Sequence, residues 1–186
     1  MEGPAEHSVE VTIKNPLGFH VRPVQRFASL ALLFRSDVEV HLRSRTVPGK
    51  SVINLVSLGG RCGDAMIITA KGEDARQCVE VLQFLAESSF FVEDSIDTAA
   101  QPSRHIERLA RIASCFESDI KVILNGKVAD AKAVNSLSAL GLKPTSVPRF
   151  QIHGRDQEQA LAVLENLVAS CFYVEDKMGR RPRKAT

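Results

Sequence analysis

An internal repeat constrains the fold of this chain more than any other feature of its sequence. When the sequence is shifted by about 82 positions, residues 22–94 align with residues 104–176 without a gap, and about a third of the aligned pairs are identical. Both segments end on a similar pattern, at residues 90–94 and 172–176. Because 186 residues are enough for two small domains, the repeat predicts two copies of one fold.

The first copy changes its hydrophobic period along the chain. Apolar residues alternate over 9–13, which predicts a half-buried strand, and they recur with helical spacing over 27–34. That helix should begin near Val21, with Pro23 in its first turn, where a missing amide costs nothing. The remaining pattern predicts strands at 38–42, 45–48 and 66–70, and helices at 51–58 and from Asp74 to residue 85, with Asp74 as a cap. The order βαββαβα predicts an α+β, open-faced β-sandwich domain with an antiparallel sheet and helices on one face.

The second copy has no counterpart of the first strand. Residues 91–102, which should align with it, complete the preceding helix and form a polar connector. We therefore predict domains at 1–94 and 104–176, a linker at 95–103 and a basic tail at 177–186. The second sheet should have three strands and a bare edge along 147–152. That edge is either capped by the connector or pairs with another strand, and the second alternative would allow a homodimer through this domain.

Composition excludes several classes of function. The hydrophobic fraction of 44% and charged fraction of 25% are typical of a soluble globular protein. A net charge of +2, with one Tyr and no Trp, argues against a nucleic-acid partner. The start of the chain lacks a secretory signal and no run reaches membrane-spanning length, so we expect a cytoplasmic protein without membrane contact.

The four cysteines predict no metal site. Cys62, Cys78, Cys115 and Cys171 are far apart, with no closely spaced pair of the kind that zinc sites use. Three of them lie in periodic apolar segments, where a thiol behaves as a small buried hydrophobe. We expect structural thiols and neither a metal nor a bound cofactor.

A histidine stands directly before the first predicted helix, in the run from Gly18 to Pro23. The first amides of a helix lack intrahelical partners and its dipole presents partial positive charge there, so the position suits an anion. A phosphoryl group on the imidazole of His20 would lie beside these amides, and the guanidinium of Arg22 would bind its oxygens. The positive helix end also favours a neutral, nucleophilic ring. From the residues alone, His20 is either a phosphoacceptor or an ordinary cap or loop residue.

The run Gly18-Phe19-His20-Val21-Arg22-Pro23 resembles the Gly-Leu-His-Ala-Arg-Pro signature of the HPr phosphocarrier family, and residues 8–94 match that family in the order of their elements. The resemblance implies that enzyme I phosphorylates His20 at the expense of phosphoenolpyruvate, that the group passes to enzyme IIA of a sugar phosphotransferase system, and that Arg22 steadies the phosphate. It implies a carrier and not an enzyme. Phe19 and Val21 depart from the usual residues, and we expect these departures to alter the choice of partner more than the chemistry, with Phe19 in the partner-binding surface.

A serine precedes the second predicted helix. Ser51 is the natural N-cap there, and it also resembles the regulatory serine that HPr kinase phosphorylates in HPr proteins. Phosphate at Ser51 would add negative charge beside the docking surface for enzyme I. Val52, Ile53 and Val56 either form an exposed patch for partner proteins or pack in part into the core. The alternative function is therefore a non-catalytic regulatory module that acts through Ser51 and protein partners.

The second copy has lost the corresponding residues. His20 aligns with Pro102 and Ser51 with Ala133, so we expect no phosphate chemistry in the second domain. His105 lies near a predicted helix start, but it lacks the preceding loop.

Overall fold

The computed structural model describes residues 5–91, 102–143 and 146–171. The elements of the first domain are β1 (Glu6–Thr12), α1 (Val21–Ala31), β2 (Asp37–Leu42), β3 (Arg45–Pro48), α2 (Val52–Ser57), β4 (Ala65–Lys71), α3 (Ala75–Glu87) and the 3-10 turn η1 (Ser89–Phe91). Those of the second domain are α4 (Pro102–Ser114), β5 (Asp119–Leu124), β6 (Lys127–Asp130), α5 (Val134–Ala139), β7 (Arg149–His153) and α6 (Gln157–Cys171).

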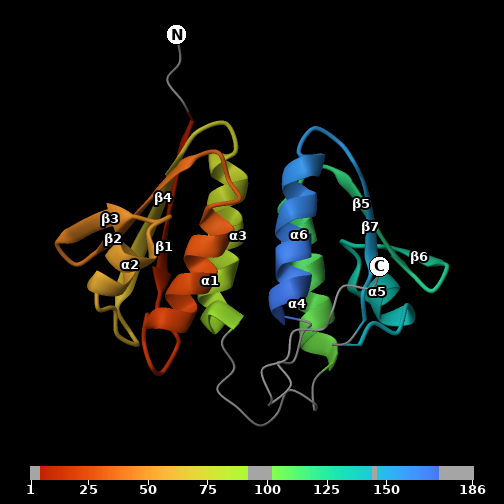
Figure 1. The fold of residues 1–186 in the computed structure, drawn as a ribbon, viewed down its shortest axis with the longest axis horizontal. Coiled ribbons are helices and arrows are strands. Elements are labelled where there is room, and N and C mark those ends of the chain that lie inside the picture. Colours follow the sequence, from red (N-terminus) through yellow and green to blue (C-terminus); the bar gives the residue numbers. More distant parts are fainter. Residues whose placement is uncertain (1–4, 92–101, 144–145, 172–186) are drawn as a thin grey trace, which may run out of the picture.

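The first domain confirms the predicted βαββαβα order. Its four strands pair antiparallel in the order β1-β4-β2-β3, and the helices cover one face of the sheet (Figure 1). The alternating apolar residues of β4 all point into the core, where Met66, Ile68 and Ala70 have no exposed surface. Pro48 lies at the end of the edge strand β3, where a missing amide breaks no ladder.

In residues 102–143 and 146–171 the second domain repeats the helices and the other three strands of the fold, while most of the segment that aligns with the first strand lies outside the described residues. Its sheet has the order β6-β5-β7, so β7 is an edge in the described part of the chain. The last helices of the two domains differ in exposure. Leu161 of α6 is 37% exposed, whereas the corresponding Val79 is 5% exposed on α3, a helix that contacts β1. A homodimer through this edge stays a prediction. Helix α4 begins at Pro102, inside the predicted linker 95–103, while the rest of that linker and the tail 177–186 lie outside the described residues.

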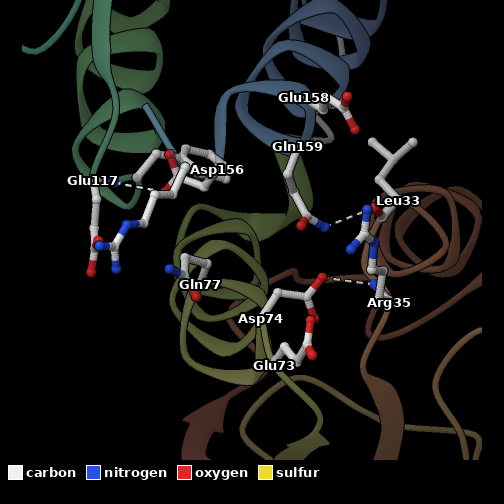
Figure 2. Close-up of a pocket in the computed structure, with 11 residues that line it drawn as sticks. Leu33, Arg35, Glu73, Asp74, Gln77, Glu117, Asp156, Glu158 and Gln159 are labelled. Atoms are coloured by element: carbon white, nitrogen blue, oxygen red, sulfur yellow. Dashed lines mark hydrogen bonds between the residues drawn. The ribbon is translucent and has the colours of Figure 1, made fainter. Parts of the chain in front are cut away.

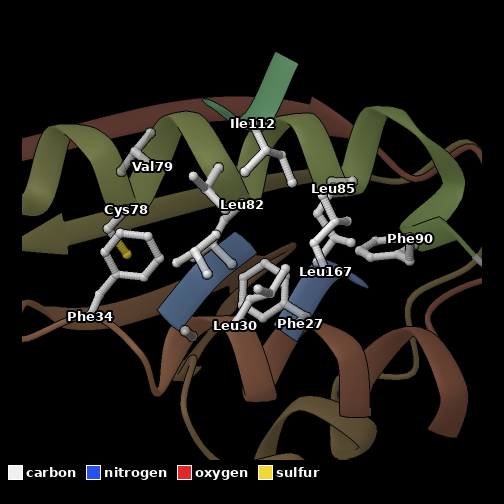
Figure 3. Packing of buried hydrophobic residues seen from close by; sticks show 14 of the residues in the cluster. Phe27, Leu30, Phe34, Cys78, Val79, Leu82, Leu85, Phe90, Ile112 and Leu167 are labelled. Atoms are coloured by element: carbon white, nitrogen blue, oxygen red, sulfur yellow. The ribbon is translucent and has the colours of Figure 1, made fainter. Parts of the chain in front are cut away.

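The helices of the two domains face each other, so that the sheets form the two outer layers (Figure 1). Gln159 of α6 donates a hydrogen bond from Nε2 to the main-chain oxygen of Leu33, over 2.9 Å (Figure 2). Figure 3 shows Leu167 of α6 among Leu30, Leu82 and Leu85 of the first domain. These residues belong to one apolar cluster that continues through both domains, so burial joins the copies.

One predicted cap is corrected by the structure. Asp74 occupies the N-cap position of α3, but its carboxylate makes no capping bond. It accepts instead from the amides of Arg35 and Ser36, and Asp156 accepts in the same way from Glu117 and Ser118. The repeated Asp therefore ties the turn after the first helix of each domain to the start of the last helix. Within the described residues, no helix is both long and apolar enough to cross a membrane.

Candidate functional site

His20 is the N-cap residue of α1, as the sequence predicts. Its backbone is extended, with φ −88° and ψ −173°, and its main-chain oxygen accepts the first helical hydrogen bond, from Val24 over 3.0 Å. Pro23 has no amide, and the amides of Val21 and Arg22 donate to no acceptor among the described residues. Two donors at the positive end of the helix dipole therefore remain for an anion beside His20.

The imidazole of His20 is half-buried, and its two nitrogens differ. Nε2 is buried and has no hydrogen-bond partner. The ring makes no described hydrogen bond, and Nδ1 is not among the buried nitrogen atoms, so Nδ1 remains accessible to solvent. A group that arrives from outside the protein can reach Nδ1 but not Nε2.

The loop before His20 is held by its own backbone and by the core. The amide of Gly18 donates to the main-chain oxygen of Asn15 over 2.8 Å, and the amide of Leu17 donates to the Asn15 side chain over 3.1 Å. Gly18 has a φ of +74°, and a Cβ there would lie 2.4 Å from the oxygen of Gly60. The sequence therefore places glycine where the left-handed backbone and the close approach both demand it.

The structure corrects the expectation for Phe19. Its side chain is 2% exposed and packs against the rings of Phe27 and Phe90, with centroids 5.8 and 5.0 Å away. Its amide donates to the oxygen of Gly60 over 2.8 Å. The residue therefore anchors the loop in the core and adds no exposed side chain to the surface, and an influence of Phe19 on the choice of partner stays a prediction.

Exposed apolar side chains lie at the start of α1 and on α2, which packs against α1. Of the three residues predicted for partner binding on α2, Ile53 is 82% exposed and Val56 is also exposed, whereas Val52 is half-buried against the core. Val21, expected to affect the choice of partner, is exposed as well, and so is Leu17, which was not predicted from the sequence. Their positions in the sequence, beside the glycine turn and at the first residue of the helix, could have indicated that they are exposed. We call Leu17, Val21, Ile53 and Val56 the apolar patch.

Ser51 lies at the N-cap of α2, which packs against α1. Its Oγ accepts from the amide of Asn54 at 3.5 Å, which is the outer limit for such a bond. The neighbouring Lys50 donates from Nζ to the main-chain oxygen of Phe34 over 2.8 Å. The hydroxyl of Ser51 is half-exposed and close to the apolar patch along the chain.

The second domain lacks these features. Ala133 replaces Ser51 at the N-cap of α5 and provides no side-chain bond. His105, the histidine near the start of α4, is buried. No group of three or more His, Cys, Asp or Glu side chains that would hold a metal ion occurs in the described ranges. Cys62, Cys78 and Cys115 are free thiols, and the side chain of Cys171 lies outside the described residues.

A cleft of about 610 Å³ between the domains lies away from His20 (Figure 2). It contains Asp74 and Asp156, whose carboxylates are occupied by the hydrogen bonds described above. Its remaining lining includes charges of both signs, among them Arg35, Glu73 and Arg155. This cleft belongs to the junction of the domains and not to the phosphate site.

Comparison with known proteins decides the family. Residues 7–88 and 99–170 match the family described as the PTS HPr component phosphorylation site, so the match covers most of the chain and both copies. The chain belongs to the HPr family. It is a tandem HPr protein with two α+β HPr domains, the second of which has three strands in the described residues.

Individual relatives match about half of this tandem HPr chain. A multiphosphoryl transfer protein of Xanthomonas campestris pv. campestris is 35% identical over 79 residues, which are 42% of this chain and 9% of that protein. The phosphocarrier protein HPr of Vibrio cholerae is 34% identical over 82 residues, 44% of this chain and 94% of the relative. A crystal structure of HPr from Thermoanaerobacter tengcongensis shares 33% identity, covers 47% of this chain and 99% of its own, and has a TM-score of 0.45. The tandem chain thus spans about a tenth of the first of these relatives and nearly all of the HPr proteins.

Proposed function

We propose that the first domain carries a phosphoryl group on His20, accepted from enzyme I at the expense of phosphoenolpyruvate and passed to enzyme IIA of a sugar phosphotransferase system. One observation carries this proposal: the reachable Nδ1 of His20 stands at a helix start where two amides lack acceptors. The names of relatives support it, since these are phosphocarrier proteins and phosphoryl donors.

The transfer follows from the two nitrogens of the ring. The lone pair of Nδ1 attacks the phosphorus of the donor's phosphohistidine, the N–P bond of the donor breaks, and a new N–P bond forms on His20. The proton of the neutral ring stays on Nε2. The amides of Val21 and Arg22 and the helix dipole stabilise the added negative charge, and the guanidinium of the exposed Arg22 binds the phosphoryl oxygens. Delivery to enzyme IIA reverses these steps onto a nitrogen of the acceptor.

The apolar patch provides the contact surface for these partners. Ile53 and Val56 on α2, which packs against α1, and Leu17 and Val21, which are close to His20 in sequence, present exposed apolar side chains. An interface core of this kind excludes water, and Arg22 adds the type of charged anchor found at binding hot spots. Enzyme I and enzyme IIA each dock there in turn.

Phosphorylation of Ser51 by HPr kinase would regulate this surface. The weak 3.5 Å cap bond leaves the hydroxyl replaceable at little cost, and its half-exposed position makes it reachable. A phosphate would add up to two negative charges next to Val52 and Ile53, in the middle of the surface that enzyme I uses. It would therefore slow phosphorylation of His20.

Labelling tests the carrier function. The full chain, enzyme I and ³²P-labelled phosphoenolpyruvate should give an acid-labile, base-stable label that His20→Ala abolishes. His41→Ala is the matched control, because His41 lies on β2 and bonds Thr46 over 2.9 Å. The control should retain the label, and transfer to enzyme IIA should discharge it. Absence of label in the unmodified chain would refute the proposal.

The regulatory module is the second candidate function, and the exposed Ile53 beside Ser51 favours it. It predicts an acid-stable label from ATP and HPr kinase, lost in Ser51→Ala, without label from enzyme I. If both labels appear, Ser51→Asp should lower the rate of His20 labelling while Ser57→Asp, on the same helix, changes it less.

A further inference from the structure

The second domain extends to the same end of the molecule as His20. Helix α3 runs toward η1, where Phe90 contacts Phe19, the neighbour of His20. Helix α4 packs antiparallel to α3, because Cys115 lies by Glu80 while Arg111 lines the same hollow as Glu87. The first residues of α4 therefore continue past the end of α3, and Figure 1 shows α1 and α4 starting at the same end of the two helix layers.

Helix α6 supports this arrangement independently. Gln159 bonds Leu33 at one end of α1, and Asn166 lines a hollow with Gln25 near the other end. Helices α1 and α6 are therefore antiparallel, as are α3 and α4. The two pairs are related by the repeat, so the domains pack like the two halves of a symmetric dimer.

The cleft at the far end of the helix layers is lined by charges of both signs, with five acidic residues and two arginines: Glu73, Asp74, Glu117, Asp156, Glu158, Arg35 and Arg155. Lys50 and Lys132 also donate hydrogen bonds near this end, to the main-chain oxygens of Phe34 and Phe116. At the other end, Arg22 lies in the first turn of α1, and Arg104 and Arg108 lie in the first two turns of α4.

We propose that the protein that phosphorylates His20 also contacts the first two turns of α4, where Arg104 and Arg108 bind an acidic part of its surface. This inference rests on the proposed function. A standard interface takes about 800 Å² of each partner, a patch about 30 Å across. Packed helices are about 10 Å apart, so the starts of α1 and α4 are separated by about 20 Å, and one footprint spans both.

The proposal gives the second domain a role without phosphate chemistry. Arg104 is exposed and Arg108 is half-exposed, and neither needs to touch the phosphoryl group. Charges at the rim of an interface mainly speed association and select partners, so they change the encounter and not the transfer step. The second copy is then a specificity element attached rigidly to the carrier.

The test is steady-state phosphorylation of the full chain by enzyme I and phosphoenolpyruvate. In the double variant Arg104→Glu/Arg108→Glu, the KM for the chain should rise about 3- to 10-fold, while kcat and the half-life of phosphohistidine stay unchanged. The difference should shrink at high salt. The double variant Lys121→Glu/Lys127→Glu is the matched control: it changes the same net charge on exposed residues of the second sheet, and its KM should equal that of the unmodified chain.

A milder double variant, Arg104→Gln/Arg108→Gln, keeps the test valid if charge reversal disturbs folding, and it should raise KM about 2- to 4-fold at an unchanged melting temperature. An unchanged KM in both arginine variants overturns the inference and leaves the carrier function intact. An equal rise in the lysine control also overturns it, because net charge alone would then explain the effect. If the unmodified chain takes up no label, the proposed function and this inference both fail.

Discussion

Asp74 and Ser36 join two elements that are 38 residues apart in the chain. The Asp74 carboxylate accepts from the amide of Ser36 over 2.8 Å and also from its hydroxyl. Burial opposes ionisation of Asp74, but these bonds and that from the amide of Arg35 outweigh burial and lower the pKa of the carboxyl. Asp156 and Ser118 repeat the arrangement in the second domain, where the pKa of Asp156 is lowered for the same reasons.

Replacing Asp74 should therefore destabilise the fold in a pH-dependent way. The pKa of Asp74 is lower in the folded protein than its ordinary value of 3.8. The ionised carboxylate therefore stabilises the folded protein at pH values above 3.8, and this contribution is lost as the pH falls below about 4. Asp74→Asn should lower the free energy of unfolding by about 1–2 kcal/mol at pH 7, a modest loss because the group is partly exposed. At pH 3 the loss should be smaller, because less of the carboxylate is ionised. Urea unfolding at both pH values measures this. The exposed Asp37→Asn should show little loss, and an equal loss at both pH values in Asp74→Asn would contradict the explanation.

Gly18→Ala should disturb the acceptor loop. The substitution combines a φ of +74° with a Cβ 2.4 Å from the oxygen of Gly60, so both strain and a clash arise. Gly59→Ala is the matched control, with a φ of +60° and no atom within 4 Å of the new Cβ. We expect a loss of about 1 kcal/mol in the control and at least twice that in Gly18→Ala, together with slower labelling of His20. Equal losses in thermal unfolding would show that the contact with Gly60 is unimportant.

Leu167→Ala should test the packing between the domains. Leu167 is 1% exposed and lies among first-domain side chains, so truncation should cost about 2–5 kcal/mol. Leu161→Ala on the same helix removes the same atoms from an exposed position and should cost less than about 1 kcal/mol. Denaturant titrations give both values. Similar values for the two variants would place the interface elsewhere.

The described thiols should react at very different rates. Burial raises the pKa of Cys78 to about 12 and that of Cys115 to about 11, whereas Cys62 is exposed. Because the thiolate is the reactive form, native protein carrying Cys171→Ser should show one fast thiol in a disulfide-exchange assay at pH 8. Cys62→Ser should remove that fast phase, and a fast phase that persists would mean that the helices open readily. Unfolding in denaturant should make the thiols of Cys78 and Cys115 reactive as well.

Local pattern was enough to predict most elements and to single out His20 as the candidate acceptor. The alternation in β1 and β4 and the start of α1 at Val21 follow from residues close in sequence. Steric rules for proline and glycine and the period of apolar residues act within a few positions, so they can be deduced without coordinates. His20 was found because its position relative to a helix start is also a local property.

Contacts between distant residues were decided by the tertiary structure. The burial of Phe19 depends on its contacts with Phe27 and Phe90, and the hydrogen bonds of the Asp74 carboxylate depend on a turn 38 residues away. The division between exposed Ile53 and half-buried Val52 depended on how α2 lies over the core.

The sequence by itself determined two copies of one fold and which copy carries the proposed phosphate site, because repeats and motifs are carried by the order of residues. The packing of the two helix layers, and with it the end of the molecule that Arg104 and Arg108 share with His20, was decided by the tertiary structure. The physical reason is that apolar burial has no direction: the pattern of a helix shows which face must be covered but not which surface covers it.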